Sequence, residues 1–201
     1  MDFFVIIFAA YILGSIPSAL WVGKWFYKVD VREHGSGNLG ATNTFRVLGK
    51  TAGFIVTLLD ILKGTVATIL PLLPLFSETT IHPLVLGLVS VVGHMYPIFA
   101  NFKGGKAVAT SGGVVLGYHW PVFLLVIIIF FIVLKLSKMV SFTSMTVAIV
   151  GFIYSVVYYF NTGDFSLLLV IGLLSLFIFY RHRENIARIR SGTEPKITWL
   201  K

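Results

Sequence analysis

The 201-residue sequence contains no cysteine and little charge. Without cysteine, the chain has no disulfide framework, no thiolate nucleophile and no cysteine metal site. Its five histidines are scattered along the chain, so we expect neither a metal centre nor a cofactor. Charged residues make up 12% of the chain, against about 25% in ordinary soluble domains. This shortage argues against a soluble globular protein.

Long apolar runs take the place of the missing charge. The chain is 57% hydrophobic and has a mean hydropathy of +0.91, which is typical of a protein that packs against lipid. The run that starts near Met1 lacks a basic segment before it and a small-residue cleavage site after it. We therefore expect a retained span and not a signal peptide. The sequence predicts an all-α, polytopic membrane protein that forms one domain over residues 1–201.

Five apolar runs each have the length of one membrane-spanning helix: 3–22, 51–75, 84–100, 142–160 and 165–180. Within the first run, Pro17 is expected to kink the helix, which membrane helices tolerate. The stretch 107–136 is ambiguous, because a single helix of that length would measure about 45 Å against a bilayer core of about 30 Å. The alternative is a short helix over 105–117 followed by a second helix over 121–136.

The distribution of basic residues decides between these alternatives. With two helices there are seven in all, and fifteen of the sixteen Lys and Arg residues share one side of the membrane. The sixteenth is the intramembrane Lys63, and the other side carries Asp2, Glu78 and Asp164. With one helix, the eight basic residues from Lys135 onward would change sides. The positive-inside rule therefore favours seven transmembrane helices, one of them short, with the N-terminus outside and the C-terminus cytoplasmic. The same rule explains the net charge of +8 without a nucleic-acid partner.

The first polar segment, His34–Arg46, is rich in glycine and in hydrogen-bonding side chains. Its letters match G-x-G-x-x-G, but a dinucleotide site needs a preceding strand and this segment follows a membrane helix. Glycines let backbone N–H groups converge on an anion, and Arg46 adds a fork that can hold a phosphate. The alternative is a flexible polar loop. The candidate substrate-binding residues here are Ser36, Gly37, Asn38, Thr42, Asn43 and Arg46.

The second polar segment covers residues 93–110. It is not a Walker A motif, because Ala100 stands where the first glycine belongs and Ala107 stands where Ser or Thr belongs. Its Gly-Gly-Lys is still expected at the start of the short helix, where N–H groups and the helix dipole favour an anion. A core or interfacial role is an equal alternative for His94, and snorkelling is the simpler account of Lys103. The candidates are His94, Lys103, Gly104, Gly105 and Lys106.

The third polar segment is Arg181–Arg190. If the last helix continues past Tyr180, His182 and Asn185 share one face of it. We expect these two residues to be functional, because the charge bias requires neither of them. A juxtamembrane basic cluster that binds anionic lipid is the preferred interpretation for the remaining basic residues, Arg183, Arg188 and Arg190.

Two ionisable residues, Asp60 and Lys63, lie one turn apart within the second apolar run. Ionisable groups at such a depth are costly and often functional. The alternative is a self-neutralising pair that also orients the helix.

The three polar segments together resemble the motifs of the PlsY family, the bacterial acyl-phosphate:glycerol-3-phosphate acyltransferases. The similar stretches are 35–43, 93–97 with 102–106, and 181–185, and the chain length and motif order agree as well. The resemblance implies transfer of a fatty acyl group from acyl phosphate to the 1-hydroxyl of sn-glycerol 3-phosphate. The products would be lysophosphatidic acid and inorganic phosphate, in the first acylation step of bacterial phospholipid biosynthesis. The H-x4-D motif of related acyltransferases is absent, since no histidine has Asp five positions later.

An acyl phosphate is already activated, so positioning and charge stabilisation could supply most of the rate without a covalent intermediate. The base is either His182 or a phosphate oxygen of the donor. The expected catalytic residues are Ser36, Lys106, His182 and Asn185. The expected ligands of the donor phosphate are Ser36, Asn38, Thr42, Gly104 and Gly105, and those of glycerol 3-phosphate are Arg46, Lys106 and Asn185.

The expected partners are the two substrates and the lipid bilayer, with no nucleic acid and a monomeric state. The resemblance implies a bacterial cytoplasmic membrane protein whose active site faces the cytoplasm. Two other functions stay open. A transporter for an anionic solute would also use short broken helices, although the motifs cluster on one side. A structural or lipid-scaffolding protein would leave the Gly-Asn-Thr motif unexplained.

Overall fold

The computed structural model describes residues 2–197 and divides the chain into two compact units, Met1–Tyr118 and His119–Lys201. Throughout the described residues the regular secondary structure is helical. Lys201, one of the basic residues that favour seven helices, lies outside the described residues. The predicted all-α fold is thus confirmed.

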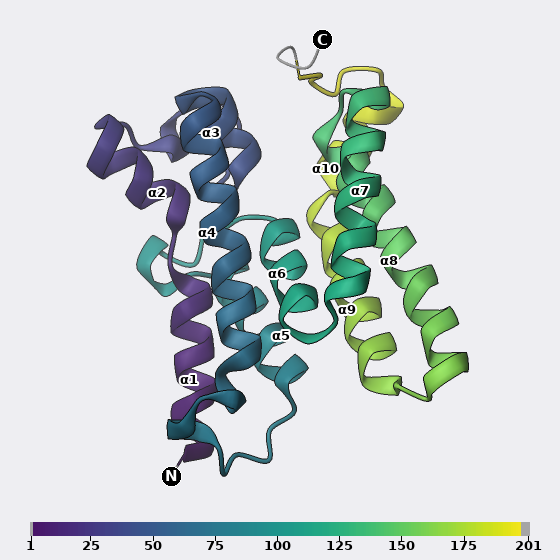
Figure 1. Cartoon of the computed structure of the whole chain (residues 1–201). Coiled ribbons are helices and arrows are strands. Elements are labelled where there is room, and N and C mark those ends of the chain that lie inside the picture. Colours follow the sequence, from purple (N-terminus) through teal and green to yellow (C-terminus); the bar gives the residue numbers. More distant parts are fainter. Residues whose placement is uncertain (1, 198–201) are drawn as a thin grey trace. The chain divides into compact units, whose positions relative to one another are not determined.

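In its described residues unit 1 contains six α-helices and the first two polar segments (Figure 1). Its α-helices are α1 Asp2–Ser15, α2 Ser18–Val22, α3 Ala41–Leu48, α4 Lys50–Ile69, α5 Pro83–Met95 and α6 Val108–Tyr118. A π-helical turn, Gly23–Tyr27, continues α2, and short 3-10 turns cover Val31–Glu33, Leu70–Leu72, Pro74–Phe76 and Ile98–Ala100. The short amphipathic α3, which the sequence analysis did not separate from the first polar loop, packs against α4.

The first membrane run bends by 47° between α1 and α2. Pro17 stands at the bend, and proline causes bends because it has no N–H and its ring clashes with the preceding turn. The predicted kink is therefore confirmed. The bend exposes the Ile16 carbonyl, which accepts hydrogen bonds from the Ser18 N–H at 3.0 Å and from Lys63 Nζ at 2.9 Å.

The short helix α6 packs closely against α4 through small residues. Thr65 Oγ1 donates to the Gly113 carbonyl at 3.0 Å, and a Cβ atom on Gly113 would overlap the Ile61 carbonyl. Small residues are typical of membrane helix contacts, because they let two backbones approach. Helix α6 runs through Gly112 and Gly113, and the chain breaks only at His119, between the two helices predicted over 105–117 and 121–136. The short helix also begins three residues later than predicted, at Val108.

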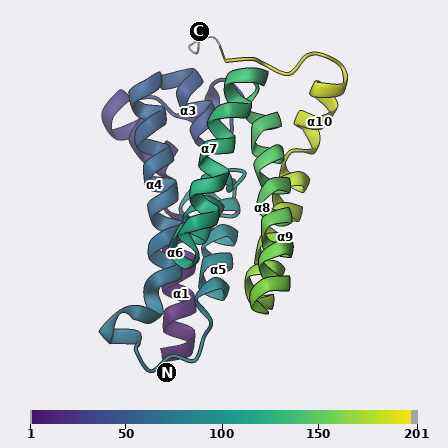
Figure 2. The same cartoon turned by 45° about the vertical axis from the view of Figure 1, so that its right-hand side comes forward.

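Unit 2 consists of α7 Trp120–Ser137, α8 Val140–Thr162, α9 Phe165–Arg181 and α10 Arg183–Arg190. Helix α8 packs against both α7 and α9 (Figure 2). Gly163 ends α8 in a left-handed conformation with φ 78°, and Asp164 caps α9 by accepting from the Leu167 N–H at 3.0 Å. A bend of 58° separates α10 from α9.

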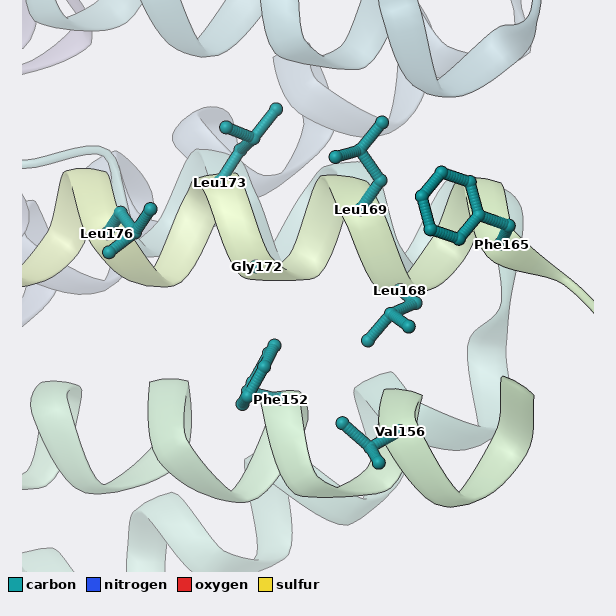
Figure 3. Close-up of a pocket in the computed structure, with 8 residues that line it drawn as sticks. All are labelled: Phe152, Val156, Phe165, Leu168, Leu169, Gly172, Leu173 and Leu176. Atoms are coloured by element: carbon teal, nitrogen blue, oxygen red, sulfur yellow. The ribbon is translucent and has the colours of Figure 1, made fainter. Parts of the chain in front are cut away.

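A groove between α8 and α9 is lined only by apolar side chains and Gly172 (Figure 3). Phe165 and Leu176, at its two ends, are 58% and 68% exposed. A groove without polar groups suits hydrocarbon and not a phosphate.

Four helices in the described residues are long and apolar enough to cross a membrane, and six spans result if each bent pair counts as one. Helix α6 adds a shorter apolar helix, Val108–Tyr118. An integral membrane fold therefore agrees with the structure. The count of seven requires both bent pairs and α6, and it stays a prediction.

Replacing Gly113 by alanine tests the contact between α6 and α4. Overpacking costs about 1–3 kcal/mol, which exceeds the gain of about 1 kcal/mol that alanine offers over glycine in a helix. We expect Gly113→Ala to lower the melting temperature in detergent by a few degrees. Gly151→Ala is the matched control, since its nearest neighbour, Val126 Cγ1, lies 3.6 Å from the added Cβ atom. Equal melting temperatures for the two variants would contradict the close α4–α6 contact.

Candidate active site

The first polar loop is shaped by the side chain of Asn43. Its Oδ1 accepts from the Ser36 N–H at 2.9 Å, and its Nδ2 donates to the carbonyls of Val31 at 2.9 Å and His34 at 3.1 Å. Asn43 is 2% exposed, and a Cβ atom on Gly35 would overlap its Oδ1. We had expected Asn43 to bind substrate. Because its amide already bonds to the loop backbone, we reassign it as the residue that holds the loop in shape.

Other polar side chains of the same segment point outward. Ser36, Thr42 and Arg46 are exposed, and Asn38 is half-buried. Thr42 and Arg46 lie four residues apart on α3, so they share one face of that helix. A hydroxyl group and a guanidinium group therefore lie near each other on α3, and each of them can bind a phosphate oxygen.

A salt-bridge cluster centred on Asp30 supports the start of this loop. Arg32 donates to both carboxylate oxygens of Asp30, at 2.9 and 2.6 Å, and Lys24 Nζ lies 3.2 Å away. The hydrogen bonds from Arg32 hold the pKa of Asp30 well below its usual range. Asp30 therefore stays ionised, and it also accepts from the Arg32 N–H in the 3-10 turn. The sequence analysis missed this residue.

The second polar loop folds back onto the end of α5. The Gly104 N–H donates to the Met95 carbonyl at 3.1 Å, and the Gly105 N–H donates to the His94 carbonyl at 3.2 Å. A Cβ atom on Gly104 would overlap the His94 carbonyl, and one on Gly105 would overlap His94 Nε2. These N–H groups, which we had assigned to an anion, are therefore used within the loop. The structure gives both glycines a steric role next to Lys106.

The two glycines that we expected to form an anion site at the start of the short helix lie before that helix. Gly104 and Gly105 precede α6 by three or more residues and do not form its first turn. Lys106 is half-buried, Lys103 is exposed, and Ala107 adopts a left-handed φ of 59° between Lys106 and the helix. A left-handed alanine is uncommon, and such conformations cluster at functional sites.

The first and second loops share one hydrophobic core. Leu39 from the first loop and Ala100 from the second are buried in the same cluster as Ala19, Leu20 and Val56. Trp21 and Phe99 add a ring contact with centroids 6.0 Å apart. The structure therefore brings both loops to the same end of unit 1.

The intramembrane residues Asp60 and Lys63 form a buried ion pair of 2.8 Å. His94, which the sequence analysis left between a core and a functional role, is buried, with Nδ1 3.6 Å from Asp60 Oδ1.

The third segment lies in unit 2, where the helix ends at Arg181 and restarts at Arg183. His182, at the break, is buried, and its Nδ1 lies 2.7 Å from the Ile178 carbonyl. A carbonyl oxygen only accepts, so Nδ1 carries the proton and Nε2 is the basic nitrogen of the neutral ring.

Asn185 binds a carboxylate that the sequence analysis missed. Asn185 Nδ2 donates to Glu194 Oε1 at 2.6 Å, Ser141 Oγ donates to the same oxygen at 2.6 Å, and Arg188 Nε donates to Oε2 at 2.8 Å. Arg188, which we had assigned to lipid contact, therefore pairs with Glu194. Burial raises the pKa of Glu194, but these hydrogen bonds outweigh it and leave the pKa below its usual value.

Comparison with known proteins identifies the family. The family model described as glycerol-3-phosphate acyltransferase matches residues 4–192. The chain belongs to this family. Glycerol-3-phosphate acyltransferases from Bacillus subtilis and Geobacillus kaustophilus are 55% and 56% identical to it. The alignments cover 98% of both chains for the first relative, and 97% of this chain and 96% of the relative for the second.

Two solved structures of PlsY, an integral membrane glycerol 3-phosphate acyltransferase, resemble the whole acyltransferase chain. The glycerol 3-phosphate form matches with a TM-score of 0.87 at 36% identity, and covers 100% of this chain and 98% of PlsY. The lysophosphatidic acid form matches with a TM-score of 0.84 at 36% identity, and covers 100% of this chain and 97% of PlsY. The resemblance seen in the three polar segments is confirmed, and the protein is an integral, multi-pass membrane enzyme.

Replacing Glu194 by glutamine should destabilise unit 2 in a pH-dependent way. A lowered pKa means that the carboxylate contributes stability above its unfolded pKa of about 4.3, and that this contribution is lost as pH falls through the folded pKa. We expect Glu194→Gln to lower the melting temperature by a few degrees at pH 7, with the difference shrinking as the pH falls below about 4. The exposed Glu78→Gln is the control. A pH-independent difference, or none, would contradict the assigned hydrogen bonds.

Proposed function

We propose that this enzyme transfers a fatty acyl group from an acyl phosphate to the 1-hydroxyl of sn-glycerol 3-phosphate, giving lysophosphatidic acid and inorganic phosphate. The observation that carries the proposal is the family match over residues 4–192, together with the structural likeness to PlsY in its glycerol 3-phosphate form. In that reaction the hydroxyl oxygen attacks the acyl carbonyl carbon, and the bond from that carbon to the phosphate oxygen breaks.

For the donor phosphate we propose the outward-facing polar groups of the first loop, Ser36, Asn38 and Thr42. Ser36 and Thr42 are exposed and Asn38 is half-buried, and they lie in or next to a loop whose backbone Asn43 fixes. Gly37 lies in this loop with a left-handed φ of 68°, which lets the chain turn at this point. The N–H groups of Gly104 and Gly105 bond to backbone carbonyls. We therefore propose that these glycines contribute to the site indirectly, by letting the second loop lie against His94.

For glycerol 3-phosphate we propose Arg46, Lys106 and Asn185. Arg46 offers a bidentate fork and Lys106 a mobile full charge, which suit the phosphate. Asn185 is held by Glu194, so its amide has a fixed orientation. Lys103 is exposed and is assigned to attraction of the anionic substrates toward the site.

Two groups can accept the proton of the attacking hydroxyl. His182 offers Nε2 as a basic nitrogen, since Nδ1 donates to the Ile178 carbonyl. The alternative is an oxygen of the departing phosphate. In either case Ser36, Lys106 and Asn185 act by positioning and by stabilising the negative charge that develops on the carbonyl oxygen and the phosphate, and His182 joins them where the phosphate oxygen is the base.

We further propose a monomer with seven transmembrane helices, the N-terminus outside and the C-terminus in the cytoplasm. The support is the positive-inside bias, with no Lys or Arg on the opposite side. The candidate site would then lie on the cytoplasmic face of the bacterial inner membrane, where phosphorylated metabolites are available.

The reaction is tested directly with purified protein, acyl phosphate and labelled glycerol 3-phosphate. We expect lysophosphatidic acid and inorganic phosphate in equal amounts, because one phosphate leaves for each acyl group transferred. Protein inactivated by heat is the control. Uptake of glycerol 3-phosphate into liposomes without product would contradict the proposal and favour a transporter.

Substitution of Lys106 tests the site assignment. Removing a charge that stabilises the transition state typically costs about 10²–10³-fold in rate, so Lys106→Ala should lower kcat/KM for glycerol 3-phosphate by about that factor. The matched control is Arg190→Ala, which removes an exposed basic residue at the end of α10 and should change kcat/KM by less than about threefold. Similar losses in both variants would show that Lys106 acts only through the general basic charge.

A further inference from the structure

A buried polar cluster lies among α2, α4 and α5, and the proposed substrate contacts do not use it. Asp60 is 2% exposed and Lys63 is 6% exposed. Asp60 Oδ1 accepts a hydrogen bond from Ser18 Oγ at 3.0 Å and lies 2.8 Å from Lys63 Nζ. Both charged side chains are carried by α4, one helical turn apart, and they lie within a segment that is apolar enough to cross a membrane.

The bend in the first membrane run explains the presence of Lys63 at this depth. Lys63 Nζ donates to the Ile16 carbonyl at 2.9 Å, next to Pro17, where the regular helix hydrogen bonds are interrupted. A polar backbone group at bilayer depth must find an internal partner, and Lys63 supplies one. The carboxylate of Asp60 then neutralises Lys63. This local account leaves the contact between Asp60 and His94 unexplained.

His94 connects the cluster to the second polar loop. Its Nδ1 lies 3.6 Å from Asp60 Oδ1. The other edge of the ring, with Nε2, lies so close to Gly105 that a Cβ atom there would overlap it. The His94 carbonyl also accepts from the Gly105 N–H at 3.2 Å. The imidazole is therefore wedged between the Asp60 carboxylate and the residue directly before Lys106.

We propose that Asp60 is a positioning residue for the acyl transfer: through His94 it fixes the Gly104–Gly105 backbone and hence the direction in which Lys106 extends. The inference rests on the proposed function of Lys106. A buried ion pair is a poor stabiliser compared with apolar side chains of the same volume, and ionisable groups at membrane depth are costly. The Asp60 carboxylate can hold one ring nitrogen of His94, and a methionine or leucine in place of Asp60 could not do so.

The test is the double variant Asp60→Asn/Lys63→Met, which removes both charges and keeps the side-chain volumes similar. A displacement of about 1 Å at a site can cost up to about a hundredfold in rate, so we expect kcat/KM for glycerol 3-phosphate to fall about ten- to hundredfold, with a rise in KM as part of that loss because Lys106 also binds the substrate phosphate. Amide hydrogen exchange should quicken in residues 96–107, because His94 no longer holds the loop.

The control is Thr68→Val on the same helix. Thr68 is fully buried, and its Oγ1 donates to the Gly64 carbonyl at 2.9 Å within α4, away from the cluster. It should leave KM and the exchange of residues 96–107 unchanged. If the double variant folds and shows the KM or the loop exchange of the parent protein, the proposal is wrong.

A second variant covers the case in which the double variant does not fold. Ser18→Ala removes one donor to Asp60 without leaving a charge unpaired. It should raise KM for glycerol 3-phosphate by about two- to fivefold, less than the double variant does, because Asp60 keeps Lys63 as a partner and is displaced only in part. An unchanged KM in that variant overturns the proposal. The proposed function fails separately, if the parent protein itself forms no lysophosphatidic acid from acyl phosphate and glycerol 3-phosphate.

Discussion

The buried ion pair between Asp60 and Lys63 joins the bent first membrane run to α4 in unit 1. A chain that bends inside a bilayer leaves backbone groups without partners, and lipid offers none. Lys63 provides a partner by donating to the Ile16 carbonyl. Asp60 neutralises the charge of Lys63 and also accepts a hydrogen bond from Ser18. The bend that this arrangement permits places Ala19 and Leu20 of α2 in the core beneath the first loop.

The polar residues of the three motifs fall into two groups. One is a frame of residues whose hydrogen bonds stay within each unit, and the other is a set of exposed residues. Asn43, Gly104 and Gly105 form hydrogen bonds within unit 1, and Glu194 accepts hydrogen bonds from Asn185 and Arg188 within unit 2. Ser36, Thr42 and Arg46 remain on the outside of a loop that the frame keeps in shape. A site that works by positioning needs such rigid support, since small displacements weaken it.

The sequence predicted those features that depend on neighbouring residues. The kink at Pro17, the helical spans and the contact of Asp60 with Lys63 three residues later all follow from local rules. Features that depend on distant contacts were missed. Nothing near Asn43 reveals that Val31 and His34 would take up its amide, and Glu194 reaches Asn185 only because the chain turns back after α10. The close contact of Gly113 with α4 was missed, because its neighbour Ile61 lies far from it in the sequence.

The central claim is that the framed polar groups act by positioning, so the acyl group passes directly from phosphate to glycerol 3-phosphate without first binding to a residue such as Ser36. Isotope exchange tests this most directly. The protein is incubated with acyl phosphate and labelled inorganic phosphate, with glycerol 3-phosphate left out. Direct transfer predicts that no label enters the acyl phosphate, because no acyl-enzyme exists from which phosphate could take the acyl group back. Label appearing in the acyl phosphate at a rate comparable to turnover would contradict the account.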